Sequence, residues 1–91
     1  MTMTTLSIHL TIAEYPSWRA AFDAMDPVRR QFGQTGYSVF RSASDPLELT
    51  VHTRWPSLEQ ARAYAISPDL KNAMQKAGIV SQPEVAFLES L

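Results

Sequence analysis

Hydrophobic and polar residues alternate strictly over residues 5–13. The apolar positions are Leu6, Ile8, Leu10 and Ile12, and the polar positions between them are Ser7, His9 and Thr11. A period of two residues predicts a strand with one buried face and one polar face. Residues 37–43, 47–55 and 84–89 are further strand-like segments, so the pattern predicts four strands.

A helical spacing of apolar side chains separates the first two strands. The stripe consists of Trp18, Phe22, Met25 and Phe32. Asp26-Pro27 interrupts it, and proline suits the first position of a helix, with aspartate just before it as a cap. We therefore expect a kink or a restart at this pair, and an end at Gly33.

A second helical region follows residues 47–55. Ser57 is a candidate helix cap, and Gln60 completes the spacing of a capping box. Ser67-Pro68 repeats the combination of a cap and a proline at the first position, so the helix should restart there and stop at Gly78.

The order strand, helix, strand, strand, helix, strand is typical of a ferredoxin-like α+β fold. It predicts one domain over residues 1–91, with an antiparallel sheet in the order 4-1-3-2 and both helical regions on one face. The other face would have no cover. A chain of 91 residues has a thin core, so we expect a second copy of the chain to cover that face in a homodimer.

The helix-free face is also where most polar side chains that could take part in catalysis or binding are expected. Asp45-Pro46 is turn chemistry, and a hairpin around it that sets Val39 opposite His52 would point Phe40 toward the helices. The residues then expected on the helix-free face are Ser7, His9, Thr11, Tyr37, Val39, Arg41, Thr50, His52 and Arg54.

Three interpretations of this polar face stay open. The first is a dimer interface in which the polar groups satisfy one another. The second is an acid–base or anion site, with a histidine that titrates near neutrality and arginines that hold a carboxylate or enolate. The third is a metal site at His9 and His52, but no carboxylate is expected beside them and no metal is predicted.

The aromatic residues allow two interpretations. They are Trp18, Phe22, Phe32, Trp55 and Tyr64, and all are expected near the gap between the sheet and the helices. Such residues pack a core more often than they line a ligand site. The same arrangement is also typical of a pocket for a flat apolar ligand.

Composition excludes several classes of function. The 8 Lys and Arg against 9 Asp and Glu give a net charge of −1, so no nucleic-acid partner is expected. The absence of cysteine excludes thiolate nucleophiles and thiolate metal sites, and is simplest in a reducing cytoplasm. The chain shows neither a signal peptide nor the about 18 apolar residues of a membrane span, so no membrane partner is expected.

Residues 15–79 resemble the dimeric α+β barrel superfamily, in particular its small antibiotic biosynthesis monooxygenase-like proteins. The clearest marks are Trp55 at the end of a strand, the helix start Ser57-Leu58-Glu59, and Ser67-Pro68. The resemblance implies a homodimer with two sheets face to face and a ligand cavity between sheet and helices in each subunit. It also implies oxidation of aromatic polyketides or quinols without a cofactor.

One feature departs from the family pattern. Many members carry a histidine in the helix after the tryptophan, where this chain has Tyr64-Ala65-Ile66. That difference argues against haem ligation.

The sequence thus predicts a homodimer that binds a small aromatic or polyketide-like molecule and oxidises it without a cofactor. The substrate-binding candidates are Trp18, Phe22, Tyr37, Arg41, Trp55 and Tyr64. His52 is the candidate titrating group, and Arg54 or Arg41 the candidate anion holder. The alternative is a binding or dimerisation module without catalysis, which a densely filled core would favour.

Overall fold

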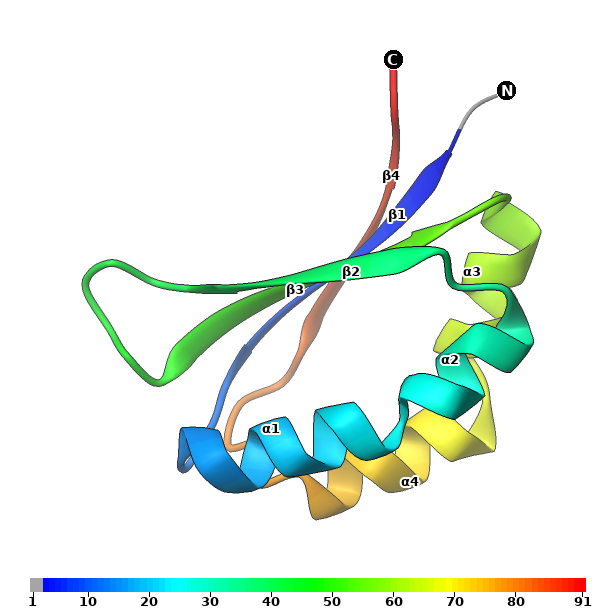
Figure 1. The fold of residues 1–91 in the computed structure, drawn as a ribbon. Coiled ribbons are helices and arrows are strands. Elements are labelled where there is room, and N and C mark those ends of the chain that lie inside the picture. The colour runs from blue at the N-terminus through cyan, green and yellow to red at the C-terminus, as the bar shows by residue number, and fades with distance from the viewer. Residues whose placement is uncertain (1–2) are drawn as a thin grey trace.

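One antiparallel sheet carries all four helices on a single face (Figure 1). The computed structural model describes residues 3–91. The strands are β1 (Thr4–Thr11), β2 (Gly36–Arg41), β3 (Glu48–Trp55) and β4 (Glu84–Glu89), and the helices are α1 (Tyr15–Ala24), α2 (Asp26–Phe32), α3 (Leu58–Ala65) and α4 (Pro68–Lys76). The strand order β2-β3-β1-β4 confirms the predicted ferredoxin-like topology.

Local sequence rules explain most element boundaries. Burial alternates residue by residue along β1 and β3, as the hydrophobic pattern predicts. The predicted restart of the first helical region is confirmed, because α1 ends before Met25 and α2 begins at Asp26. Gly33 ends α2 with a φ of 111°, a left-handed conformation that glycine adopts readily.

The role predicted for Asp26 as a helix cap is wrong. Asp26 is already the first residue of α2, and its side chain makes no cap hydrogen bond. Its carboxylate instead accepts from Arg30 Nε at 2.8 Å and lies 3.6 Å from Arg29 Nη2. Three- and four-residue spacing on a helix favours such ion pairs over a cap.

The two serine caps are confirmed. Ser57 Oγ accepts from the Gln60 backbone N–H at 3.2 Å, and its hydroxyl donates to Gln60 Oε1 at 2.9 Å. Ser67 Oγ accepts from the Leu70 N–H at 3.2 Å and donates to the Tyr64 carbonyl at 2.7 Å. Ser67 therefore joins the end of α3 to the start of α4.

The predicted register of the β2–β3 hairpin is wrong by one residue. Val39 lies opposite Val51, and His52 lies opposite Ser38. Because side chains alternate between the two faces of a sheet, this shift places Phe40 on the helix-free face. It also turns the side chains of Tyr37, Val39 and Arg41 toward the helices.

The hairpin loop explains the shift. Its residues 42–47 are closed by a Ser42 N–H bond to the Glu48 carbonyl, and Asp45 Oδ1 accepts from the Leu47 N–H. The predictions for β3 and β1 hold, because Thr50, His52 and Arg54 pair through β3 with the polar side of β1. The predicted faces of β1 and β3 are therefore confirmed, and only the predicted faces of β2 are exchanged.

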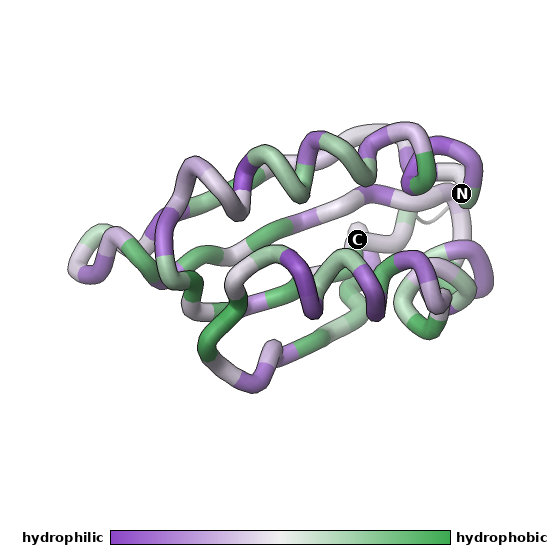
Figure 2. The backbone as a smooth tube through the Cα atoms, turned by 90° about the horizontal axis from the view of Figure 1, so that it is seen from below, coloured by the Kyte–Doolittle hydropathy of each residue, from purple (hydrophilic) through white to green (hydrophobic). Residues whose placement is uncertain are grey.

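The core fills the space between the sheet and the helices. Figure 2 views the molecule from the helix side and shows apolar and polar positions interspersed along the helical segments. The fully buried apolar residues are Leu6, Ile12, Leu49, Trp55 and Ala61. Within residues 3–91, none of the helices combines the length and apolarity that crossing a bilayer requires.

Trp55 is expected to be a main contributor to stability. Its side chain is fully buried, its Nε1–H donates to Thr53 Oγ1 at 2.9 Å, and its ring stacks on Tyr64 at 5.1 Å. Trp55→Ala should lower the free energy of unfolding by about 3–5 kcal/mol, measured by urea denaturation. Val80→Ala, at a 64% exposed position, should change it by less than about 0.5 kcal/mol. Equal effects of the two changes would contradict this role.

Candidate functional site

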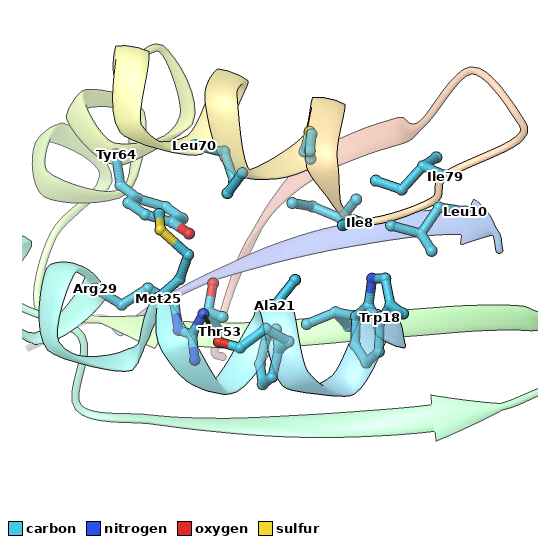
Figure 3. Close-up of a pocket in the computed structure, with 15 residues that line it drawn as sticks. Ile8, Leu10, Trp18, Ala21, Met25, Arg29, Thr53, Tyr64, Leu70 and Ile79 are labelled. Atoms are coloured by element: carbon cyan, nitrogen blue, oxygen red, sulfur yellow. Dashed lines mark hydrogen bonds between the residues drawn. The ribbon is translucent and has the colours of Figure 1, made fainter. Parts of the chain in front are cut away.

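A cavity of about 60 Å³ lies between the inner faces of β1 and β3 and the helices (Figure 3). Most of its wall is apolar. Trp18 and Phe22 come from α1, Met25 from the α1–α2 junction, and Leu70 and Met74 from α4. Such a space suits a hydrophobic molecule, because apolar walls offer no competing polar partners.

Arg29 forms one polar end of this cavity. The side chain is only 2% exposed, and its Nε donates to Gln34 Oε1 at 2.8 Å while Nη1 donates to the Phe22 carbonyl at 2.9 Å. The guanidinium carbon lies 3.9 Å from the centre of the Phe22 ring. Nη2 is buried and has no hydrogen-bond partner within the described residues.

Tyr64 and Thr53 add hydroxyl groups to the same wall. Burial raises the pKa of the Tyr64 phenol above its usual value, and the nearby Arg29 guanidinium opposes this rise. The phenol is therefore neutral at physiological pH and is able to donate a hydrogen bond. Trp55, stacked at 5.1 Å, and Phe32, edge-on at 5.7 Å, hold the tyrosine ring in place.

A second hollow lies on the other side of α4. This groove of about 380 Å³ is bordered by Ala65, Ile66 and Val85 among others. Ile8, Leu70 and Met74 line both the groove and the cavity. On α4, which has no fully buried residue, Leu70 and Met74 lie between the two spaces.

The structure separates the predicted site residues. Trp18, Phe22 and Tyr64 line the cavity, whereas Trp55 lies behind Tyr64. Tyr37 packs edge-on against Phe22 at 5.0 Å and accepts a hydrogen bond from Arg19. The Arg41 guanidinium lies over the Tyr15 ring at 5.0 Å, near the sheet edge. These last two predicted residues are therefore outside the cavity wall.

His52 and Arg54 lie on the helix-free face. His52 packs edge-on against Phe40 at 5.3 Å, and Arg54 donates to Ser38 Oγ and to the Tyr37 carbonyl. The sheet therefore stands between both residues and the cavity of the same subunit. A catalytic role for them stays a prediction, and it concerns a molecule on the helix-free face.

The expectation of no carboxylate beside the histidines is wrong for His9. Its Nε2 lies 2.6 Å from Glu48 Oε1, and its Nδ1 lies 3.0 Å from Thr50 Oγ1. These two contacts occupy both ring nitrogens. Residues 3–91 contain no group of three histidines, cysteines or carboxylates arranged to hold a metal ion.

Arg29 was not among the predicted site residues. Trp18, Phe22, Met25 and Phe32 are separated by four, three and seven residues, and Arg29 divides the last interval into four and three. An arginine thus occupies a core position of the apolar stripe. That position was the available signal for a buried charge.

The sequence profile of the antibiotic biosynthesis monooxygenase family matches residues 15–76, about two thirds of the chain. The chain belongs to this family. The match spans α1 to α4 and includes Arg29 and Tyr64. No curated protein matches the chain.

Solved structures of other proteins share the fold. A Bordetella bronchiseptica protein provisionally named as an antibiotic biosynthesis monooxygenase superposes with a TM-score of 0.83 at 14% identity, over 100% of this chain and 99% of its own. SnoaB, a cofactor-independent oxygenase from Streptomyces nogalater, gives 0.81 at 12% identity, over 100% and 95%. A Mycobacterium tuberculosis protein gives 0.71 at 23% identity, over 98% and 95%. At these identities the likeness establishes the fold.

The raised pKa of Tyr64 predicts a pH dependence of stability. Its ordinary value is 10.0, so the neutral phenol contributes its full stabilisation below pH 10. That contribution is lost as the pH rises through the higher pKa of the folded state. In urea unfolding between pH 9 and 11, Tyr64→Phe should therefore lose less stability than the unchanged protein. Parallel losses in both proteins would show that Tyr64 does not titrate as proposed.

Proposed function

We propose that this family member binds a small, flat aromatic or polyketide-like molecule between sheet and helices and oxidises it with molecular oxygen, without a cofactor. The main support for this proposal is the apolar cavity with a buried polar end, in a chain that belongs to the antibiotic biosynthesis monooxygenase family. SnoaB, with the same fold, is a cofactor-independent oxygenase, which supports this reaction class.

The proposed reaction uses electrons from the substrate. The ionised form of an electron-rich ring reacts with oxygen at an activated methylene carbon. The methylene group and one O₂ become a carbonyl group and one water, and the four electrons that reduce oxygen come from the substrate carbon. The protein needs to hold the anion, orient it and keep bulk water away, and the apolar wall serves the last purpose.

The cavity alone is too small for such a substrate. It measures about 60 Å³, whereas pockets for small organic molecules usually hold roughly 300–1,000 Å³. The groove beyond Leu70 and Met74 measures about 380 Å³. We therefore infer that α4 shifts outward on binding and that the two spaces join. The absence of buried residues in α4 keeps the cost of this shift low.

We also propose a homodimer formed through the helix-free face. All four helices lie on the opposite face, and Phe40 on this face is 51% exposed. A sheet with one uncovered face is a common site of pairing between copies. In this arrangement His52 and the His9–Glu48 pair belong to the subunit interface.

A second candidate function is ligand binding without turnover. Among the described residues that line the cavity, there is no histidine, aspartate or glutamate. The described wall thus offers no imidazole or carboxylate to take a proton from the substrate, and this observation supports the second candidate. In an enzyme the substrate has to arrive already ionised, or lose its proton to water.

Filling the cavity tests both candidates. Ala73 on α4 lines the cavity, whereas its neighbour Asn72 is exposed. Ala73→Phe should weaken binding of hydroxylated bicyclic aromatics that carry an activated methylene group by about tenfold or more, because the added ring occupies the ligand space. Asn72→Phe is the matched control and should have no effect. Tryptophan fluorescence reports binding, and incorporation of ¹⁸O from labelled oxygen reports turnover.

Two outcomes separate these functions. Binding that Ala73→Phe weakens by at least this factor, together with ¹⁸O in the product, supports the oxygenase. The same binding without ¹⁸O supports the second candidate. Equal ligand binding by both variants would place the ligand elsewhere and contradict the proposed cavity.

The dimer is tested by placing a charge on the helix-free face. Phe40→Asp should convert the protein from a dimer to a monomer of 10.2 kDa in analytical ultracentrifugation, because an unpaired carboxylate is costly to bury. Val80→Asp introduces the same charge at an exposed apolar residue outside the named strands and should leave the dimer intact. A monomeric unchanged protein, or a dimer that survives Phe40→Asp, would contradict this interface.

A further inference from the structure

We propose that Arg29 and Tyr64 form a binding site for a single ionised oxygen at the polar end of the cavity, so that the protein selects aromatic molecules as their phenolate or enolate anions. This proposal rests on the proposed function and names the substrate class of the same cavity. Three observations support it: Arg29 is buried, its Nη2 donor has no hydrogen-bond partner among residues 3–91, and Tyr64 lines the same cavity.

Arg29 is a buried cation with an incomplete counter-charge. The nearest carboxylate is Asp26, whose Oδ1 lies 3.6 Å from Nη2, beyond hydrogen-bond distance. Asp26 makes a shorter contact of 2.8 Å with the exposed Arg30. One carboxylate thus serves two arginines. A buried charge is costly unless it is fully paired, so an anion in the cavity would relieve a cost that the folded protein carries.

The guanidinium is held in a fixed orientation with one nitrogen free. Gln34 and the Phe22 carbonyl fix Nε and Nη1, and the Phe22 ring covers the guanidinium face. Nη2 is buried without an acceptor among residues 3–91. Buried donors are nearly always paired in native proteins, and this one belongs to a residue that lines the cavity. A ligand oxygen is the partner that this donor lacks.

Tyr64 supplies the second donor. Its side chain extends from α3 and that of Arg29 from α2, as Figure 3 shows, and Arg29 is close enough to oppose the rise in the pKa of Tyr64. A neutral phenol beside a guanidinium offers two donors, of which one is charged, to the same acceptor. This combination favours an anion over a neutral carbonyl, because hydrogen bonds between charged groups are the stronger ones.

The free nitrogen also distinguishes among anions. Carboxylates and phosphates prefer two parallel hydrogen bonds from an arginine. Arg29 has a single Nε–H and Gln34 accepts it, so the side-on pair of Nε and Nη2 is closed to a bidentate ligand. A single oxygen atom attached to a flat ring fits both the one remaining nitrogen and the apolar wall. The closed side-on edge and the mostly apolar wall therefore favour phenolates and enolates over carboxylates.

A matched ligand pair tests this assignment. 2-Hydroxy-1,4-naphthoquinone is ionised at pH 7, and its methyl ether has the same ring system without a charge. The unchanged protein should bind the hydroxy compound about tenfold more tightly or better, measured by quenching of tryptophan fluorescence. Arg29→Met keeps a long side chain without the charge and should remove this preference while the ether still binds. Arg30→Met, at the exposed neighbour, should retain the preference.

Further variants keep the test decisive if Arg29→Met does not fold. Arg29→Lys retains the charge and should retain part of the preference, and Tyr64→Phe should reduce it. Equal binding of the two ligands by the unchanged protein would overturn the anion site and leave the proposed small-molecule binding intact. An anion preference for these ligands, with no ¹⁸O incorporated into a hydroxylated aromatic that carries an activated methylene group, would support the site and contradict the oxygenase. Binding of neither ligand would overturn both.

Discussion

The stacking of Trp55 on Tyr64 links every layer of the candidate site. Trp55 ends β3, and its indole is anchored on Thr53 of the same strand. Tyr64 lies against it and places a hydroxyl at the cavity wall. The Tyr64 carbonyl in turn accepts from Ser67, which caps α4. Sheet, helix and cavity wall are therefore positioned by one continuous chain of contacts.

The two faces of the sheet carry different kinds of polar side chain. The helix side holds a buried arginine and a phenol within apolar walls. The other side holds His9, His52 and Arg54, which are partly exposed and bonded to neighbouring strands. The sheet thus separates both histidines from the apolar cavity of the same subunit.

Strand and helix patterns made most of the fold predictable, because these signals are local. Alternation fixed the faces of β1 and β3, and Gly33 and the two serines fixed helix ends. The register of β2 was not predictable in the same way. It depends on how residues 42–47 close the hairpin, and a difference of one residue inverts the whole strand.

The candidate site was predictable only in part. Aromatic residues at helical spacing pointed to Trp18, Phe22 and Tyr64, all of which line the cavity. Arg29 was missed because arginine is normally exposed, so its place in the apolar stripe was not counted. The partners that keep it buried, Gln34 and the Phe22 carbonyl, are tertiary contacts that no spacing rule reveals.

The attachment of α4 at both ends restricts what the site admits. Ser67 ties its start to α3, and after its last turn the Gly78 carbonyl accepts from the Ala13 N–H while Ile79 pairs with Ile12. A helix held at both ends has to move as a whole in the proposed outward shift, so it would open a narrow slit along its length rather than a wide mouth at one end. A slit of that shape would admit planar rings edge-first and exclude globular molecules of equal volume.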